Sequence, residues 1–203
     1  MLRITDVAPG LWLWTTSDPR AGAFAPLTST CIESNEERYV LDPVLPPEGA
    51  VHVFERLDAA PPTAFAVLKP DHVRDTDAFT QRYPAAAFGP RLFFRGDAPR
   101  TELRYVDPGT ELPGDVHALY DGRGRNETPL WFPAQRTIVF ADALNALDGE
   151  LRVWATPWHE ERTLPALRAL LDLPFDSVVV SHGQPLHGRA DYEAALRRPA
   201  FSA

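Results

Sequence analysis

The sequence contains very little lysine and cysteine. Lys69 is the only lysine and Cys31 the only cysteine among 203 residues. A single cysteine excludes an internal disulfide and a zinc cage built from cysteines, so any metal in this protein must be held by His, Asp or Glu. The chain also has no Gly-x-Ser-x-Gly elbow and no phosphate-cradling glycine loop. Ser181 beside His182 does not make a catalytic triad by adjacency, because the base must approach the hydroxyl in space.

Positive charge and long apolar runs are scarce as well. The formal net charge is -8 at pH 7, and the Lys/Arg clusters that drive phosphate binding do not occur. We therefore expect a small-molecule substrate and no nucleic-acid partner, with the oligomeric state left open. The first residues, MLRITDVAPG, lack the apolar core of a signal peptide, and no later segment is long enough to span a bilayer. These features predict a cytoplasmic protein that does not contact a membrane.

The composition that remains is that of a globular protein. With 44% hydrophobic and 24% charged residues, the chain is expected to form one domain over residues 1–203. The predicted strands are LWLWTT, the hairpin TCIESNEERYVLD with its turn at Asn35 and Glu36, Phe65 to Leu68, LFFRG, TELRYV, DVHALYDG, TPLWF, TIVF, RVWATP and SVVV. The predicted helices cover residues 48–59, 75–82, 164–171 and 191–197. Strands with helices in both halves favour an α+β fold, a four-layer αββα sandwich.

The stretch AVLKPDHVRDTDAF carries the clearest chemical signal. Its strand, Phe65 to Leu68, runs almost directly into Asp71 and His72. A carboxylate beside an imidazole at the exit of a strand is a common way to build a metal or acid/base site, because the strand holds the backbone while the loop exposes the side chains. Asp142 in VFAD and His182 in VVVSHG stand at strand ends in the same way.

The order of these motifs, with VLDP ahead of them, resembles the metallo-β-lactamase superfamily over nearly the full chain. That family has an αββα sandwich with its active site at one edge. Its signature is a His-x-His-x-Asp-His loop, a third histidine, an aspartate that bridges two metals and a final histidine. Asp71 and His72 match the Asp-His end, Asp142 the bridging aspartate and His182 the final histidine. The resemblance implies that these four residues form one metal site, and we expect their side chains to converge.

The partner site of that signature is incomplete. Without gaps its first two histidines fall at Val67 and Lys69, and the third falls near Asp121 or Gly122. The resemblance therefore implies a divergent member with a degenerate site, whose metal centre is mononuclear.

Two interpretations of the retained residues stay open. Two carboxylates and two imidazoles suit one divalent Zn, Mn or Fe ion with open positions for a water nucleophile. Alternatively, the metal has been lost, and Asp142 and His182 are hydrogen-bonded to loop groups. The first interpretation predicts a metal-dependent hydrolase of a small ester, thioester, amide or phosphoester, with Asp71 and Lys69 as catalytic residues. The second predicts a catalytically inactive member that acts as a binding or interaction protein, and the resemblance does not choose between them.

Lys69 is the subject of a more specific hypothesis. Two carboxylates that face one pocket repel each other, so a cation is needed between them. We hypothesise that Lys69 points into the pocket and pairs with Asp142 or Asp71. The alternative is an exposed lysine, the usual place for this residue type.

Several further residues have two interpretations each. His159, ahead of two glutamates, is a candidate ligand or base or else part of a polar loop. Glu127, near the missing third histidine, is a candidate base or else belongs to a turn or strand edge. The remaining candidates are aromatic and either wall a cleft or lie in the core: Trp12, Trp14, Trp131 and Trp158.

Overall fold

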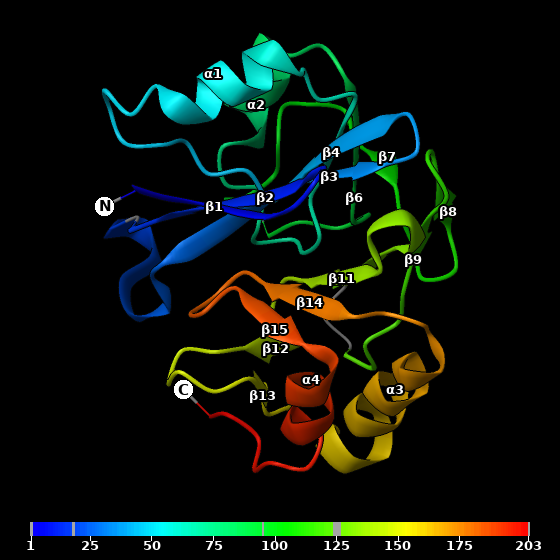
Figure 1. The fold of residues 1–203 in the computed structure, drawn as a ribbon. Coiled ribbons are helices and arrows are strands. Elements are labelled where there is room, and N and C mark those ends of the chain that lie inside the picture. Colours follow the sequence, from blue (N-terminus) through cyan, green and yellow to red (C-terminus); the bar gives the residue numbers. More distant parts are fainter. Residues whose placement is uncertain (1, 18, 95, 124–126, 203) are drawn as a thin grey trace.

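Two β-sheets lie face to face, and helices cover the outer side of each (Figure 1). The computed structural model describes residues 2–17, 19–94, 96–123 and 127–202. Within them, the first sheet has seven strands in chain order: β1 (Leu2–Ala8), β2 (Leu11–Thr16), β3 (Leu27–Ser34), β4 (Glu37–Leu41), β5 (Ala64–Ala66), β6 (Ala86–Gly89) and β7 (Arg104–Tyr105). The described part of the second sheet has six strands, ordered β15 (Leu186–Gly188), β14 (Ser177–Val180), β11 (Thr137–Phe140), β10 (Leu130–Phe132), β9 (Val116–Ala118) and β8 (Glu111–Leu112).

The helices are short and divide between the two outer faces. Helices α1 (His52–Ala59) and α2 (Thr76–Arg82) cover the first sheet, and α3 (Leu164–Ala169) and α4 (Arg189–Ala195) cover the second (Figure 1). Smaller elements are the ribbon of β12 (Leu144–Asn145) and β13 (Arg152–Val153), the 3₁₀ turns Pro19–Phe24, Pro133–Gln135 and Leu170–Asp172, and a π-helical turn, His159–Thr163.

Alternation along the strands explains why both faces of the first sheet are apolar. In β2, Leu13 packs between the two sheets, whereas Trp14 belongs to the cluster beneath α1 and α2. In β3, Ile32 and Cys31 divide in the same way. Successive side chains of a strand point to opposite faces, so a continuous apolar run is what a sheet covered on both sides requires. A third cluster joins the second sheet to α3 and α4. The predicted four-layer αββα sandwich is confirmed.

Cys31 lies in the layer between the first sheet and its helices. It is 1% exposed, and burial raises the pKa of its thiol to about 12. A neutral, enclosed thiol is an inert core residue, since only the thiolate is reactive or binds metal.

The topology brings four loops to one edge of the sandwich. Strand β4 runs parallel to β5, and β11 runs parallel to β14, so each pair ends on the same side. The loop after β14 meets the start of β3, where the Thr28 N–H donates to the Ser181 carbonyl at 2.9 Å. The two sheets are therefore joined at this edge by main-chain contacts.

One predicted strand is wrong. Residues Leu92 to Phe94 of LFFRG form an irregular segment, with Leu92 64% and Phe94 60% exposed, and Arg95 lies outside the described residues. The physical reason is pairing. Strand β6 ends at Gly89, whose carbonyl accepts the Val106 N–H at 2.9 Å, so the segment of β7 occupies the edge that LFFRG would have used. Apolar composition does not make a strand when no partner is available.

Strand β1 was not predicted, because its side chains alternate only between intermediate and exposed positions and carry no buried stripe. It pairs with β2 through a tight turn in which Gly10 has a φ of +77°. None of the described helices combines the length and apolar character needed to cross a bilayer.

Candidate metal centre

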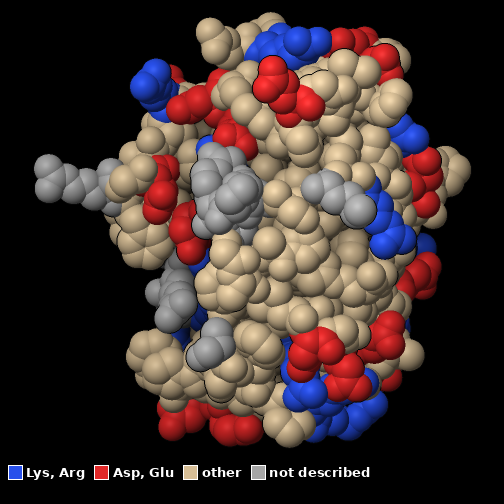
Figure 2. Space-filling view, turned by 90° about the vertical axis from the view of Figure 1, so that its left-hand side faces the viewer, with Lys and Arg blue, Asp and Glu red and all other residues tan. Residues whose placement is uncertain are grey.

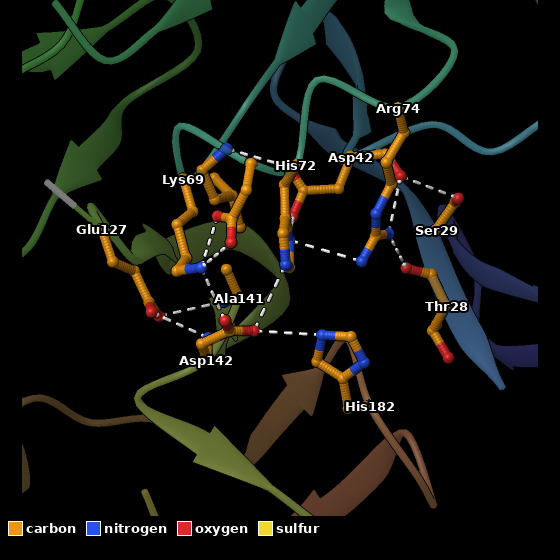
Figure 3. A network of polar contacts seen from close by, with 12 residues as sticks. Thr28, Ser29, Asp42, Lys69, His72, Arg74, Glu127, Ala141, Asp142 and His182 are labelled. Atoms are coloured by element: carbon orange, nitrogen blue, oxygen red, sulfur yellow. Dashed lines mark hydrogen bonds and ion pairs between the residues drawn. The ribbon is translucent and has the colours of Figure 1, made fainter. Parts of the chain in front are cut away.

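A cleft of about 760 Å³ opens at the edge where the four loops meet. Its floor carries Lys69, Asp71 and His72 from the loop after β5, Asp142 from the loop after β11 and His182 from the loop after β14. Figure 3 shows the side chains of Lys69, His72, Asp142 and His182 turned toward one another, although they come from both sheets. The expected convergence of the predicted site residues is therefore observed.

Asp142 is the centre of this group. Its Oδ2 lies 2.8 Å from Lys69 Nζ, whereas its Oδ1 lies 3.3 Å from His72 Nε2 and 3.1 Å from His182 Nε2 (Figure 3). Burial raises the pKa of Asp142, but the neighbouring histidines and the ammonium outweigh it and hold this pKa well below its usual value. The carboxylate is thus an anion whose two oxygens have different neighbours.

The two histidines are oriented by hydrogen bonds at their other ring nitrogen. His182 Nδ1 lies 2.8 Å from the Phe24 carbonyl, and His72 Nδ1 lies 2.8 Å from Asp42 Oδ2. A carbonyl only accepts, so His182 Nδ1 carries the hydrogen, and the Asp42 carboxylate favours the same tautomer for His72. Each Nε2 therefore faces Asp142.

The electrostatics of His72 follow from the same neighbours. Burial and the Arg74 guanidinium lower its pKa, but Asp142 and Asp42 outweigh both and raise it to about 8. The imidazole lies in a pocket that favours positive charge, whether a proton or another cation supplies it.

The donor set fits a divalent metal ion. Ligand atoms of His72, Asp142 and His182 all lie within 4.8 Å of one another. Asp142 Oδ1 is buried and has no partner with hydrogen-bond geometry among the described residues, although both Nε2 atoms are close to it. Two imidazoles and one carboxylate oxygen that face a common point are a typical set for Zn²⁺ or Fe²⁺. Their second ring nitrogens are already held, as metal-binding histidines require.

Asp71, the fourth predicted ligand, lies outside that group. Its carboxylate is 40% exposed and accepts hydrogen bonds from Lys69 Nζ at both oxygens. Lys69 itself is only 5% exposed. Burial lowers the pKa of Lys69, but Asp142 and Asp71 outweigh it, so this pKa is raised and the ammonium form is favoured. The alternative of a lysine exposed to solvent is wrong.

Glu127 holds the loop that carries Asp142. Its two carboxylate oxygens accept hydrogen bonds from three successive backbone N–H groups, those of Ala141 at 3.1 Å, Asp142 at 2.8 Å and Ala143 at 3.1 Å. The buried Arg123 donates to the same carboxylate at 3.2 Å. The Glu127 side chain is fully buried and faces the backbone rather than the cleft. It therefore acts as a clamp, by which we mean that its carboxylate fixes the backbone of residues 141–143.

The remaining candidates do not line the cleft. His159 begins the π-helical turn, and Trp14 and Trp131 lie in the core clusters. The aromatic wall of the cleft is instead formed by Trp154 and Phe24, whose ring centroids are 5.5 Å apart.

Three of these functional contributions were missed in the sequence. Asp42 belongs to the VLDP motif, but no role was predicted for its side chain. Phe24 and Trp154 belong to no motif. For Asp42, its position at the end of a buried strand beside the motif was the available signal. Phe24 contributes its main-chain carbonyl, which accepts the hydrogen bond from His182, and a main-chain group cannot be inferred from the type of residue.

Comparison with known proteins identifies the fold. No protein-family model and no curated protein sequence matches this chain. Solved structures do match. A metallo-β-lactamase from Pontibacter korlensis has a TM-score of 0.71 and 15% identity, covering 98% of this chain and 100% of that one. FIM-1 from Pseudomonas aeruginosa, in a mono-zinc form, has a TM-score of 0.71 and 15% identity, with coverage of 97% and 93%.

A third similar structure is a metallo-β-lactamase from Erythrobacter litoralis with β-mercaptoethanol in its active site. It has a TM-score of 0.69 and 17% identity, covering 97% of this chain and 95% of that one. The chain therefore has the metallo-β-lactamase fold over nearly its whole length. At these identities the likeness concerns the fold, and the chemistry has to be argued from the residues of this chain.

Proposed function

We propose that this protein is a hydrolase that uses one divalent metal ion, held by His72, Asp142 and His182, to cleave a small uncharged ester, thioester or amide. The observation that carries the proposal is the buried Asp142 Oδ1, which faces two imidazole Nε2 atoms without a hydrogen-bond partner among the described residues. The mono-zinc form of FIM-1, a protein with the same fold, is consistent with a single ion in such a cleft.

An ion at these three atoms would supply Lewis acidity, which activates water and polarises an acyl carbonyl. The chain's own residues prepare the position. Asp42 and the Phe24 carbonyl hold the imidazoles in the tautomer that leaves Nε2 available. Asp71, the most exposed carboxylate of the centre, is the group best placed to accept a proton from water entering the cleft.

The charges in the cleft favour an uncharged substrate over a phosphoester. Its cationic lining residues are already engaged by the protein: Lys69 by carboxylates, Arg123 by Glu127, and Arg74 by the carbonyls of Thr28 and Asp42. Acidic residues line the cleft as well, among them Asp77 and Asp97. An anionic substrate would meet these acids, and the bound metal ion would be its only cationic partner that is not already engaged by the described lining residues, so phosphoesters are disfavoured relative to uncharged acyl substrates.

The molecular surface shows the same balance. On the face in Figure 2, basic side chains, which in this chain are arginines apart from the buried Lys69, occur as separate small groups beside acidic ones, around a largely uncharged centre. The cleft adds an apolar wall of Phe24, Leu27 and Trp154. An acyl group of modest size that packs against this wall would bring its carbonyl toward the histidines.

The test combines metal analysis with substrate screening. Protein purified without a His tag is stripped with chelator, titrated with Zn²⁺ and Mn²⁺, and assayed with p-nitrophenyl acetate, p-nitrophenyl butyrate, a thioester and bis-p-nitrophenyl phosphate. We expect one equivalent of bound metal and metal-dependent cleavage of the carboxylic esters in preference to the phosphodiester.

A matched pair of histidine variants gives the control. His182→Ala is expected to abolish metal uptake and cleavage, whereas His52→Ala, on the surface of α1 with a side chain 76% exposed, is expected to change neither. Protein that takes up no metal, or cleavage that survives His182→Ala, would overturn the proposal.

A further inference from the structure

Lys69 lies where a second cation would otherwise be needed. Three carboxylate oxygens converge on its Nζ, two from Asp71 and Oδ2 of Asp142. An ammonium has three N–H donors and no acceptor, so three acceptors match its hydrogen-bonding capacity. The side chain is 5% exposed, and it is the only lysine of the chain. A buried ammonium surrounded by carboxylates acts through its charge.

The two oxygens of Asp142 divide the centre into two cation positions. Oδ2 contacts the ammonium, while Oδ1 faces the two histidines. Asp71 adds its carboxylate only to the ammonium side. Without Lys69, three oxygens would surround that side, and oxygen ligands of this kind suit a hard divalent ion such as Mn²⁺ or Mg²⁺.

We propose that Lys69 restricts the centre to one exogenous divalent ion, because its ammonium permanently occupies the position between Asp71 and Asp142. One of the two cations of the centre is thereby a side chain of the protein, and only the other has to be bound from solution. The inference rests on the proposed metal site for the histidine side, but the ammonium side is tested without any substrate.

The electrostatic consequence is specific. The ammonium neutralises one of the two carboxylate charges, so the centre attracts a single ion less strongly than it would with Lys69 uncharged, and it repels a second ion. Metal-free protein is stabilised by the same pairing, because a buried carboxylate left alone is strongly unfavourable. Removing the charge should therefore raise metal uptake and lower metal-free stability together.

The first experiment is a metal titration of three proteins by isothermal calorimetry and elemental analysis. Wild type is expected to bind one Zn²⁺ or Mn²⁺ per chain. Lys69→Met, which keeps the length of the side chain without its charge, is expected to bind a second Mn²⁺ and to bind the first ion at least about tenfold more tightly. Lys69→Arg, the matched control that keeps the charge, is expected to bind one ion.

Urea unfolding in chelator gives a second readout. Lys69→Met is expected to unfold at lower urea than wild type and Lys69→Arg, and added Mn²⁺ should restore its midpoint. If Lys69→Met does not fold without metal, the double variant Lys69→Met/Asp71→Asn removes the unpaired carboxylate as well, and it should fold and bind one ion only.

The third readout uses the wild-type protein alone. Because the chain has a single lysine, protein labelled with ζ-¹⁵N lysine gives one side-chain signal. We expect a slowly exchanging NH₃⁺ signal in metal-free protein near neutral pH, which shifts but persists when Zn²⁺ is added. A fast-exchanging signal like that of free lysine would overturn the inference.

Failures of the two proposals are distinguishable. Wild type that binds two ions, or a Lys69→Met variant with the same stoichiometry, affinity and stability as wild type, would overturn the role of Lys69. A wild type that binds one ion with a protected lysine signal, yet cleaves no ester, would leave the role of Lys69 standing and overturn the proposed function.

Discussion

The buried carboxylate of Asp142 has its charge balanced differently on its two sides, which are the lysine side, where Oδ2 contacts Lys69, and the histidine side, where Oδ1 faces His72 and His182. On the lysine side, the charge of the carboxylate is met by an ammonium that belongs to the chain. On the histidine side, the buried Oδ1 has two imidazoles nearby and no partner with hydrogen-bond geometry within the described residues. Burial makes charge expensive on both sides. The difference supports the proposal that the lysine side is complete as folded, whereas the histidine side takes a cation from solution.

The largest effect is expected from Asp142→Asn, which breaks both sides at once. The amide keeps the shape but removes the charge that faces Lys69, His72 and His182. Because a buried ammonium loses one of its two carboxylates, we expect the free energy of unfolding to fall by about 3 kcal/mol and metal binding to be lost.

Urea unfolding and metal titration measure these two changes. Asp176→Asn is the matched control, since its ion pair with Arg136 lies on the surface. A variant with wild-type stability and metal affinity would show that Asp142 does not join the two sides.

A smaller effect is expected when the loop beneath Asp142 is loosened. Glu127→Gln replaces one oxygen that accepts backbone N–H groups with an NH₂ that repels them. Leaving one or more buried N–H groups without an acceptor should lower the free energy of unfolding by about 2 kcal/mol. The metal affinity should fall as well, because Asp142 is no longer held in position.

Glu55→Gln on α1, with a side chain 63% exposed, is the control for this substitution. Unfolding of the metal-free proteins and calorimetry with Zn²⁺ give the comparison. If Glu127→Gln lowers stability but leaves metal affinity unchanged, the clamp supports the fold and not the centre.

Asp42→Asn separates the two sides. Asp42 accepts from His72 Nδ1, whereas the ion-pair partners of Lys69 are Asp71 and Asp142, so we expect only the histidine side to respond. Substitution of a carboxylate that orients a metal-binding histidine commonly lowers metal affinity by about 10- to 100-fold, and we expect a loss in that range.

The ζ-¹⁵N signal of Lys69 in the metal-free variant is the internal control, and it should match that of wild type. A changed lysine signal with unchanged metal affinity would contradict the division into two sides. The Leu68 N–H also donates to Asp42, at 2.8 Å, and asparagine keeps an oxygen to accept it.

The convergence at the sheet edge could be predicted from the sequence, because residues that follow strands match the metallo-β-lactamase signature in their order. Asp71, His72, Asp142 and His182 each stand just after an apolar run. Strands that run in the same direction within one sandwich end at the same edge, but the resemblance to the metallo-β-lactamase superfamily was needed to say which strand ends meet. The division of roles among them was not predictable. Asp71 and His72 are neighbours in sequence, yet Asp71 contacts the ammonium of Lys69, whereas His72 faces Asp142 Oδ1.

The parts that were missed depend on the path of the backbone. The clamp by Glu127 needs three N–H groups of residues 141–143 to point at one carboxylate, which is a property of the turn and not of its residue types. Four tryptophans were candidates for the cleft wall or the core, but the tryptophan that lines the cleft is the fifth, Trp154. A tryptophan in a strand points to the core or to the cleft according to register, and register is set by pairing that a single sequence does not specify.

The smallest effect is expected at the apolar wall of the histidine side. Phe24, a residue that is 39% exposed, accepts a hydrogen bond from His182 at its backbone carbonyl, while its ring lies against Trp154. Phe24→Ala removes the ring and keeps the carbonyl. Metal affinity should therefore stay as in wild type, whereas contact with the acyl group of a substrate is lost. We expect KM for p-nitrophenyl butyrate to rise about fivefold, which corresponds to about 1 kcal/mol of apolar contact, and KM for the acetate ester to change less.

Tyr105→Ala, which removes an exposed ring on β7 away from the cleft lining, is the control and should leave both KM values unchanged. The comparison of the two esters distinguishes a Phe24 ring that contacts the substrate from one that only supports the loop that positions His182. If Phe24→Ala weakens metal binding and lowers cleavage of both esters equally, the ring acts by holding the loop that positions His182. If only the butyrate ester is affected, the ring is part of the substrate site, and the two sides of Asp142 differ in their access to substrate as well as in the source of their cation.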